Sequence, residues 1–192
     1  MDLDYLLFHW INGLAGRWPL LDGAMRTVVN EYFIPTALPL FLLGLWFIGR
    51  TPAERAYCQE TAVRTVVTVL VASALLKLCN LVYFRPRPFA EHEVNLLFYK
   101  PWDSSFPSNP AVVGFAFAVP VFMRHRRLGM LMLLLAFLFG FSRIYCGVHY
   151  PLDVVAGALL GAVVGWWMVH RARFLDPLVR WAIRLGRRLY LA

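Results

Sequence analysis

The sequence is poor in charged side chains and in cysteine, and both shortages narrow what the chain can be. Charged residues make up only 16% of the 192 positions, whereas hydrophobic residues make up 60%. A soluble domain of this size rarely has such a composition, so we expect an integral membrane protein. The three cysteines, Cys58, Cys79 and Cys146, are widely spaced and form no C-x-x-C pair. They argue against a disulfide framework and against a zinc site.

Two further absences concern cofactors and targeting. No cluster of Asp, Glu and His has metal-ligand spacing, which favours chemistry without a metal or any other cofactor. The first residues lack a basic stretch and carry Asp2 and Asp4, so they do not resemble a cleaved signal peptide. We expect the segment 1–30 to begin as an amphipathic helix at the membrane interface.

The positive charge is concentrated, which bears on the partners of the chain. The net charge is +8, and six arginines crowd the segment 171–192 among apolar residues such as Phe174 and Trp181. This pattern is typical of an amphipathic helix on an anionic leaflet. It favours a lipid bilayer over nucleic acid as the partner.

Apolar runs dominate the middle of the chain. Five of them approach the length that crosses about 30 Å of hydrocarbon. They are Tyr32 to Ile48, Thr61 to Phe84, Ala111 to Met123, Leu128 to Phe141 and Leu152 to His170. We therefore predict an all-α membrane bundle of five to six spans, forming one domain over 1–192, with its oligomeric state left open.

The loops between these runs predict an orientation. The turn Arg124–Arg127 and the arginine-rich tail fall on one face, which the positive-inside rule makes cytoplasmic. The long polar connection 85–109 and the polar segment 142–153 fall on the other face. In a bacterial cytoplasmic membrane that face opens to the periplasm or the cell exterior.

The polar segment Ser142–Asp153 carries the strongest chemical signal. His149 precedes a helix that we expect to begin near Pro151, and Asp153 lies about one turn further on, close enough to hold the imidazole in one tautomer. Arg143 supplies a guanidinium nearby. Such a set suits nucleophilic attack on phosphorus, with the arginine holding phosphoryl oxygens. The alternative for this segment alone is a helix cap with a snorkelling arginine.

Two other segments are candidates for binding phosphate. The first, Arg85-Pro86-Arg87-Pro88, places two guanidiniums at a helix end, although a juxtamembrane basic turn has the same composition. Lys77 lies two to three turns earlier, where snorkelling to the interface competes with a phosphate contact. The second, Phe106–Pro110, predicts a helix start with Ser108 or Asn109 as the N-cap, and free backbone N–H groups there form an anion site.

Taken in order along the chain, these segments resemble the type 2 phosphatidic acid phosphatase superfamily. The pattern of that family is a lysine six residues before Arg-Pro, then Pro-Ser-Gly-His, then Ser-Arg, five residues, His, three residues, Asp. Ser142, Arg143, His149 and Asp153 meet the third part at every position, and Arg87 begins the Arg-Pro of the first. The segment Tyr83–Gly157 further resembles the bacitracin-resistance type of undecaprenyl pyrophosphate phosphatase. The resemblance implies His149 as nucleophile, Asp153 as its orienting carboxylate, and Arg87, Arg143 and the other polar residues as the phosphate cradle.

The chain departs from that pattern at two positions. The family lysine would fall at Asn80, one helical turn from Lys77. More seriously, Pro110 stands where the family has the histidine that protonates the leaving group, and proline donates no proton. His92 is the one unassigned histidine of the same loop that can be considered as a substitute. Loss of a general acid slows the hydrolysis of monophosphate esters, which expel an alkoxide, far more than the hydrolysis of diphosphates, which expel a phosphate monoester.

The sequence thus predicts a membrane lipid phosphatase that converts undecaprenyl pyrophosphate to the monophosphate through a phosphohistidine, with activity impaired at Pro110. Three alternatives stay open. The first is a binder or carrier of lipid phosphates that has the same fold but no turnover. The second is a phosphotransferase that passes the phosphoryl group to another lipid. The third is a phosphatase that acts on phosphatidic acid or phosphatidylglycerol phosphate. Pro110 itself is compatible with an inactivating substitution, a natural variant of altered activity, or a binding protein.

Overall fold

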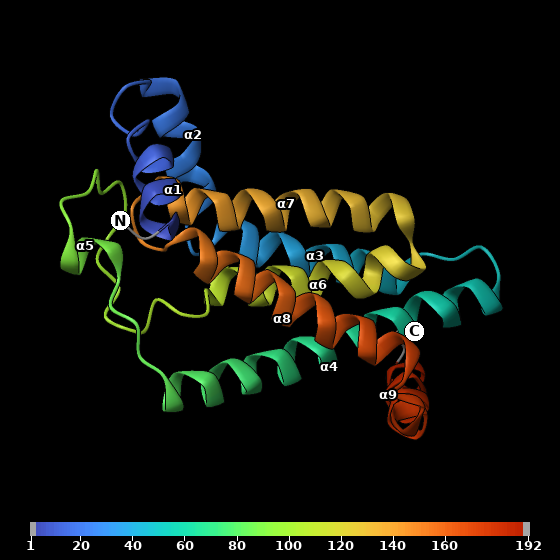
Figure 1. The fold of residues 1–192 in the computed structure, drawn as a ribbon. Helices are drawn as coiled ribbons and strands as arrows, with labels where there is room; N and C mark the ends of the chain where they lie inside the picture. Colours follow the sequence, from blue (N-terminus) through green and yellow to red (C-terminus); the bar gives the residue numbers. More distant parts are fainter. Residues whose placement is uncertain (1–2, 190–192) are drawn as a thin grey trace.

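The computed structural model describes residues 3–189, and all regular secondary structure in that range is helical (Figure 1). The all-α prediction is confirmed. The helices in chain order are α1 Leu3–Asn12, α2 Pro19–Val29, α3 Phe33–Phe47, α4 Pro52–Val82, α5 Pro88–Glu91, α6 Asn109–Arg124, α7 Arg126–Tyr145, α8 Pro151–His170, the 3-10 turn η1 Arg173–Leu175, and α9 Asp176–Arg188.

Helix α6 lies at the centre of the bundle and separates two apolar cores. It packs chiefly on α8 and α7, and then on α4. One core joins α6 to α3 and α7 through buried residues such as Leu38, Val121 and Met132. The other joins it to α4 and α8 through Leu76, Val112 and others. The buried residues of α6 are small or medium-sized, which lets other helices pack closely on both of its sides; they are Ala111, Val112, Gly114, Ala116, Ala118, Pro120 and Val121.

A row of glycines on α8 allows its close approach to α6. A Cβ atom built on Gly161 would lie 2.4 Å from the carbonyl oxygen of Val112, and one on Gly157 would lie 2.5 Å from that of Ser108. A side chain at either position would collide with backbone, which cannot rotate away. The glycines at four-residue spacing are therefore packing residues, and they hold the start of α8 beside the start of α6.

Gly161→Ala is expected to lower the thermal stability of the protein because α6 and α8 must separate to admit the methyl group. Overpacking of this kind costs about 1–3 kcal/mol. Gly44→Ala on α3 is the matched control, since nothing lies within 4 Å of a Cβ there and alanine is the better helix former. Thermal unfolding in detergent checks the pair, and equal melting temperatures for the two variants would contradict this packing.

The number of membrane spans is not confirmed as five to six. Within the described residues, α4, α7 and α8 are long and apolar enough to cross a membrane, and the pair α2 and α3, bent by 55°, makes a fourth if it counts as one span. Helix α6 has an apolar sequence but only 16 residues. All of the expected apolar runs are helical, yet α6 begins at Asn109 and ends at Arg124, which makes it too short for a full span by length alone.

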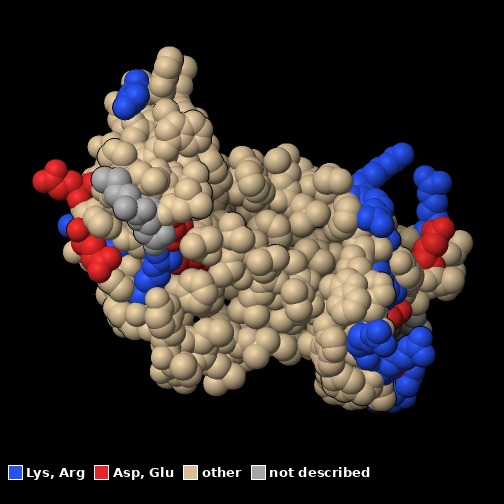
Figure 2. Space-filling model, in the orientation of Figure 1, with Lys and Arg blue, Asp and Glu red and all other residues tan. Residues whose placement is uncertain are grey.

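The two ends of the bundle differ in charge. In Figure 2 acidic and basic side chains mix at the end that carries α1 and α5, basic side chains prevail at the end that carries α9, and the girdle between them is almost free of charge. At the basic end α9 is tied to α4 because Arg64 forms an ion pair with Asp176. At the mixed end α1 is packed on α7 and α8, with Asp4 and Phe8 buried.

Candidate active site

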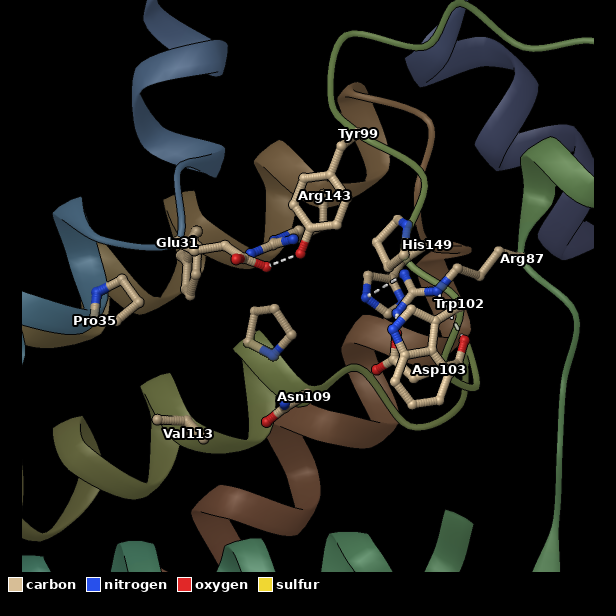
Figure 3. A pocket seen from close by; sticks show the side chains of 13 residues that line it. Glu31, Pro35, Arg87, Tyr99, Trp102, Asp103, Asn109, Val113, Arg143 and His149 are labelled. Atoms are coloured by element: carbon tan, nitrogen blue, oxygen red, sulfur yellow. Dashed lines mark hydrogen bonds and ion pairs between the residues drawn. The ribbon is translucent and has the colours of Figure 1, made fainter.

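A cavity of about 490 Å³ lies at the mixed end and draws its walls from six parts of the chain. The residues that line it are Glu31, Pro35, Arg87, Tyr99, Pro101, Trp102, Asp103, Asn109, Pro110, Val113, Phe139, Arg143 and His149. They come from the α2–α3 turn, α3, the long α4–α6 connection, the start of α6, α7 and the α7–α8 turn, which meet at one place (Figure 3).

His149 lines the cavity and is held in one tautomer by its hydrogen-bond partners. The guanidinium of Arg87 lies with Nη1 3.2 Å from Nε2, and since arginine has only donors, Nε2 is the acceptor. The proton therefore belongs on Nδ1, which donates to the carbonyl oxygen of Ser105 at 2.9 Å. An imidazole in this state carries its reactive lone pair on Nε2.

The surroundings keep this imidazole neutral. Burial, opposed by Asp153 and reinforced by the charge of Arg87, lowers the pKa of His149 to about 4. A depressed pKa means that the proton is lost well below neutral pH. His149 is thus a free base over the whole physiological range, which a nucleophile requires.

Asp153 lies on the expected side of His149 but does not bond it directly. Its Oδ2 atom is 3.8 Å from Nδ1 and accepts instead from the Ser105 hydroxyl at 2.5 Å and from the Tyr150 N–H at 2.9 Å. The expectation of a direct carboxylate–imidazole hydrogen bond differs from this geometry because the Ser105 carbonyl takes the Nδ1 proton. Asp153 therefore acts on the imidazole through its charge and through Ser105.

A second acidic residue, far away in sequence, belongs to the same network. Arg85 donates from Nη1 to Asp153 at 2.6 Å and from Nη2 to Asp4 at 2.7 Å. Asp4 also accepts the N–H of Leu152 at 2.9 Å, in the first turn of α8. Both carboxylates have side chains with no exposed area. Helix α1 is thereby anchored to the elements that position His149.

The two arginines of the cavity differ in their partners. Arg87 is saturated, since it donates to Asp103 Oδ1 at 2.8 Å and to the Val148 carbonyl at 2.8 Å besides His149. Arg143 is only 4% exposed, and within the described residues it has no ion pair and no hydrogen bond. Its guanidinium stacks on the rings of Phe98 and Phe139. A buried guanidinium without an ion-pair partner is costly, so Arg143 favours the binding of an anion in this cavity, with the carboxylate of Glu31 acting on it only at longer range.

The first turn of α6 forms the cavity wall beside Arg143. Ser108 is the N-cap, and Asn109 and Pro110 are the first two helical residues, both of them lining the cavity. The backbone N–H of Ser108 donates to the carbonyl of Asp153, and its buried hydroxyl has no hydrogen-bond partner among residues 3–189. The helix start thus lies where an anion would sit, and position 110 faces the same space as His149.

Comparison with known proteins agrees with this arrangement. Residues 61–175 match the model of the PAP2 superfamily. The chain belongs to this superfamily. Over 95% of its length it is 31% identical to undecaprenyl-diphosphatase BcrC of Bacillus subtilis, and the match covers 91% of that protein. Over 93% of its length it is 34% identical to bacitracin transport permease protein BcrC of Bacillus licheniformis, and the match covers 86% of that protein. The crystal structure of Aquifex aeolicus LpxE superposes with a TM-score of 0.68 and 31% identity, over 88% of this chain and 96% of that one.

Three residues considered from the sequence lie away from the cavity of this PAP2 protein. Lys77 is exposed on α4 and does not line it. Ser142 is fully buried, and its hydroxyl donates to the carbonyl of Phe139 at 2.7 Å. His92 is exposed and packs against Tyr5, with ring centroids 4.2 Å apart. The other residues predicted from the sequence gather at or directly behind the cavity; they are Arg87, Ser108, Asn109, Pro110, Arg143, His149 and Asp153.

Several residues of the site were not foreseen. Ser105 and Asp4 act on Asp153, Asp103 holds Arg87, and Glu31 with Tyr99 borders Arg143. Asp103 and Ser105 stand in the polar run before Phe106, so their segment was visible as a functional loop. Asp4 and Glu31 lie more than a hundred residues before His149 in the sequence. The only sequence signal for them is an acidic residue within a largely apolar segment.

Proposed function

We propose that the chain is a membrane phosphatase that removes the terminal phosphate from a polyprenyl diphosphate such as undecaprenyl pyrophosphate. The observation that carries the proposal is the buried, unpaired guanidinium of Arg143 facing the neutral Nε2 atom of His149 across one cavity. A phosphoryl group supplies the missing negative charge and the electrophile together. Membership of the PAP2 superfamily and the undecaprenyl-diphosphatase named among the relatives support it.

The proposed reaction begins when His149 Nε2 attacks the terminal phosphorus and the bridging P–O bond breaks. Arg143 and Arg87 neutralise the phosphoryl oxygens, for which Arg87 exchanges its bond to Nε2 for one to the substrate. The imidazole gains positive charge as it is phosphorylated, and the carboxylate of Asp153 at 3.8 Å stabilises that charge. Water then hydrolyses the phosphohistidine and regenerates the site.

Pro110 favours a diphosphate over a monophosphate substrate. No group at position 110 protonates the leaving oxygen, and a phosphate monoester leaves without a proton far more readily than an alkoxide does. The girdle between the two charged ends is almost free of charge in Figure 2, and many large hydrophobic side chains are exposed on the helices, which favours a substrate that also lies in the bilayer. By the positive-inside rule the arginine-rich end is cytoplasmic, which would open the cavity to the periplasm or cell exterior of a bacterial cytoplasmic membrane.

The test is phosphate release by the purified protein from undecaprenyl pyrophosphate, with phosphatidic acid and phosphatidylglycerol phosphate assayed alongside. We expect release of inorganic phosphate from the diphosphate and little from the two monophosphates. Saturable binding without release from any substrate would instead identify a lipid-phosphate binder. A new phosphorylated lipid in place of inorganic phosphate would identify a phosphotransferase.

A further inference from the structure

Glu31 places a carboxylate on the wall of the cavity, although it comes from the short turn between α2 and α3. Glu31 is exposed at the cavity edge, and Oε1 accepts a hydrogen bond from the hydroxyl of Tyr99. Burial, together with Glu31, raises the pKa of Tyr99 to about 12, so the phenol stays protonated and keeps donating. The carboxylate is therefore held in place, while Oε2 has no hydrogen-bond partner among the described residues.

The position of Glu31 relative to the nucleophile follows from Figure 3. Glu31 and His149 appear on opposite sides of Arg143, and all three residues line the same cavity. A phosphoryl group bound by Arg143 and attacked by His149 would thus present its opposite face toward Glu31. In-line displacement requires the leaving group to depart from that face. Water that later hydrolyses the phosphohistidine must approach the phosphorus from the same side.

The other groups of the cavity cannot serve that water. Asp103 is the second carboxylate on the wall, but it is engaged by Arg87 at 2.8 Å, beside His149. Pro110 accepts no proton through its side chain. Tyr99 is a protonated donor. Of the residues lining the cavity, Glu31 is thus the free proton acceptor on the side away from the nucleophile.

We propose that Glu31 is the general base of the second half-reaction, an inference that rests on the phosphohistidine mechanism proposed above. The water oxygen forms a bond to phosphorus, its proton passes to the Glu31 carboxylate, and the P–Nε2 bond breaks with its electron pair returning to His149. The products are inorganic phosphate and the neutral imidazole, and Glu31 then releases its proton to solvent. The first half-reaction needs no acid when the leaving group is a phosphate monoester.

Glu31→Gln separates the two half-reactions. With a polyprenyl diphosphate labelled in its terminal phosphate, we expect a burst of lipid monophosphate followed by steady-state turnover reduced about 10²–10⁴-fold, the usual contribution of general base catalysis. The label should accumulate on the protein as a phosphohistidine, stable in alkali and labile in acid. A purely structural role for Glu31 would slow both steps and leave no phosphorylated protein.

Two controls keep the failures apart. Glu93→Gln changes an exposed carboxylate that does not line the cavity and should turn over like the parent chain. His149→Gln should show no labelled protein. Parent turnover with no accumulation in Glu31→Gln overturns the base assignment alone. Turnover retained by His149→Gln overturns the phosphohistidine mechanism, and the role of Glu31 with it.

Discussion

Replacing His149 with alanine is expected to lower phosphate release from a polyprenyl diphosphate by roughly 10⁴-fold or more, as removal of a covalent nucleophile does in other enzymes. The lowered pKa of His149 keeps its imidazole neutral at pH 7, so Nε2 has a lone pair that can attack phosphorus once Arg87 releases it. His149 lines the same cavity as Arg143. Neither arginine can replace it, because guanidinium groups have no lone pair to offer.

The measurement is initial-rate phosphate release in detergent, with phosphorylated protein assayed in parallel. His149 is 1% exposed, so alanine leaves a void; His149→Gln therefore accompanies it, and the melting temperature of each variant is recorded. His170→Gln, an exposed histidine at the far end of α8, is the matched control and should retain full activity. Full phosphate release by both His149 variants would refute the nucleophile assignment.

The sequence predicted the helices well and the site in part, and the difference has a physical basis. Apolar runs and their proline and glycine boundaries determine helices locally, so all five predicted runs are helical. The span count depends on helix length, and α6 falls short of a full crossing because Asn109 and Arg124 bound it. The row at Gly157, Gly161 and Gly165 is likewise readable from local spacing, because small residues four apart lie on one helix face and allow a neighbouring helix to approach.

Within the site, the sequence predicted which residues share a helix turn, but it did not predict contacts between distant parts of the chain. The four-residue spacing of His149 and Asp153 predicted that they lie on one side, but the Ser105 carbonyl that accepts the Nδ1 proton comes from a loop 44 residues away. Lys77 was considered because its helix leads toward Arg87. The chain leaves the helical course at Tyr83, and Lys77 stays on the exposed face of α4.

The connection from α1 to the nucleophile illustrates the same limit. In the sequence Asp4 served as an argument against a signal peptide, and the amphipathic helix expected at the membrane interface within 1–30 stays a prediction. The structure adds that Asp4 is buried against Arg85 and the start of α8, and that Asn12 donates to the Asn95 and Tyr145 carbonyls at 2.9 and 2.8 Å. Buried polar side chains of this kind need partners that only the folded chain assembles.

Pro110→His is expected to raise turnover of a lipid monophosphate by about 10²–10⁴-fold while changing diphosphate turnover much less. Position 110 lines the cavity, so an imidazole there can protonate a departing alkoxide, which needs the proton. A departing phosphate monoester does not. Histidine is also compatible with the second position of α6, where no intrahelical N–H bond is lost.

The ratio of the two rates is the deciding measurement, taken with phosphatidic acid and undecaprenyl pyrophosphate under the same conditions. Pro101→His is the matched control, since it adds an imidazole to the same cavity from the α4–α6 connection rather than from α6. If the absence of an acid at position 110 causes the preference for the diphosphate, only Pro110→His lowers the ratio of diphosphate turnover to monophosphate turnover. If neither variant hydrolyses either lipid although both bind it, the cavity is a binding site for lipid phosphates, and Arg143 serves retention of the headgroup instead of catalysis.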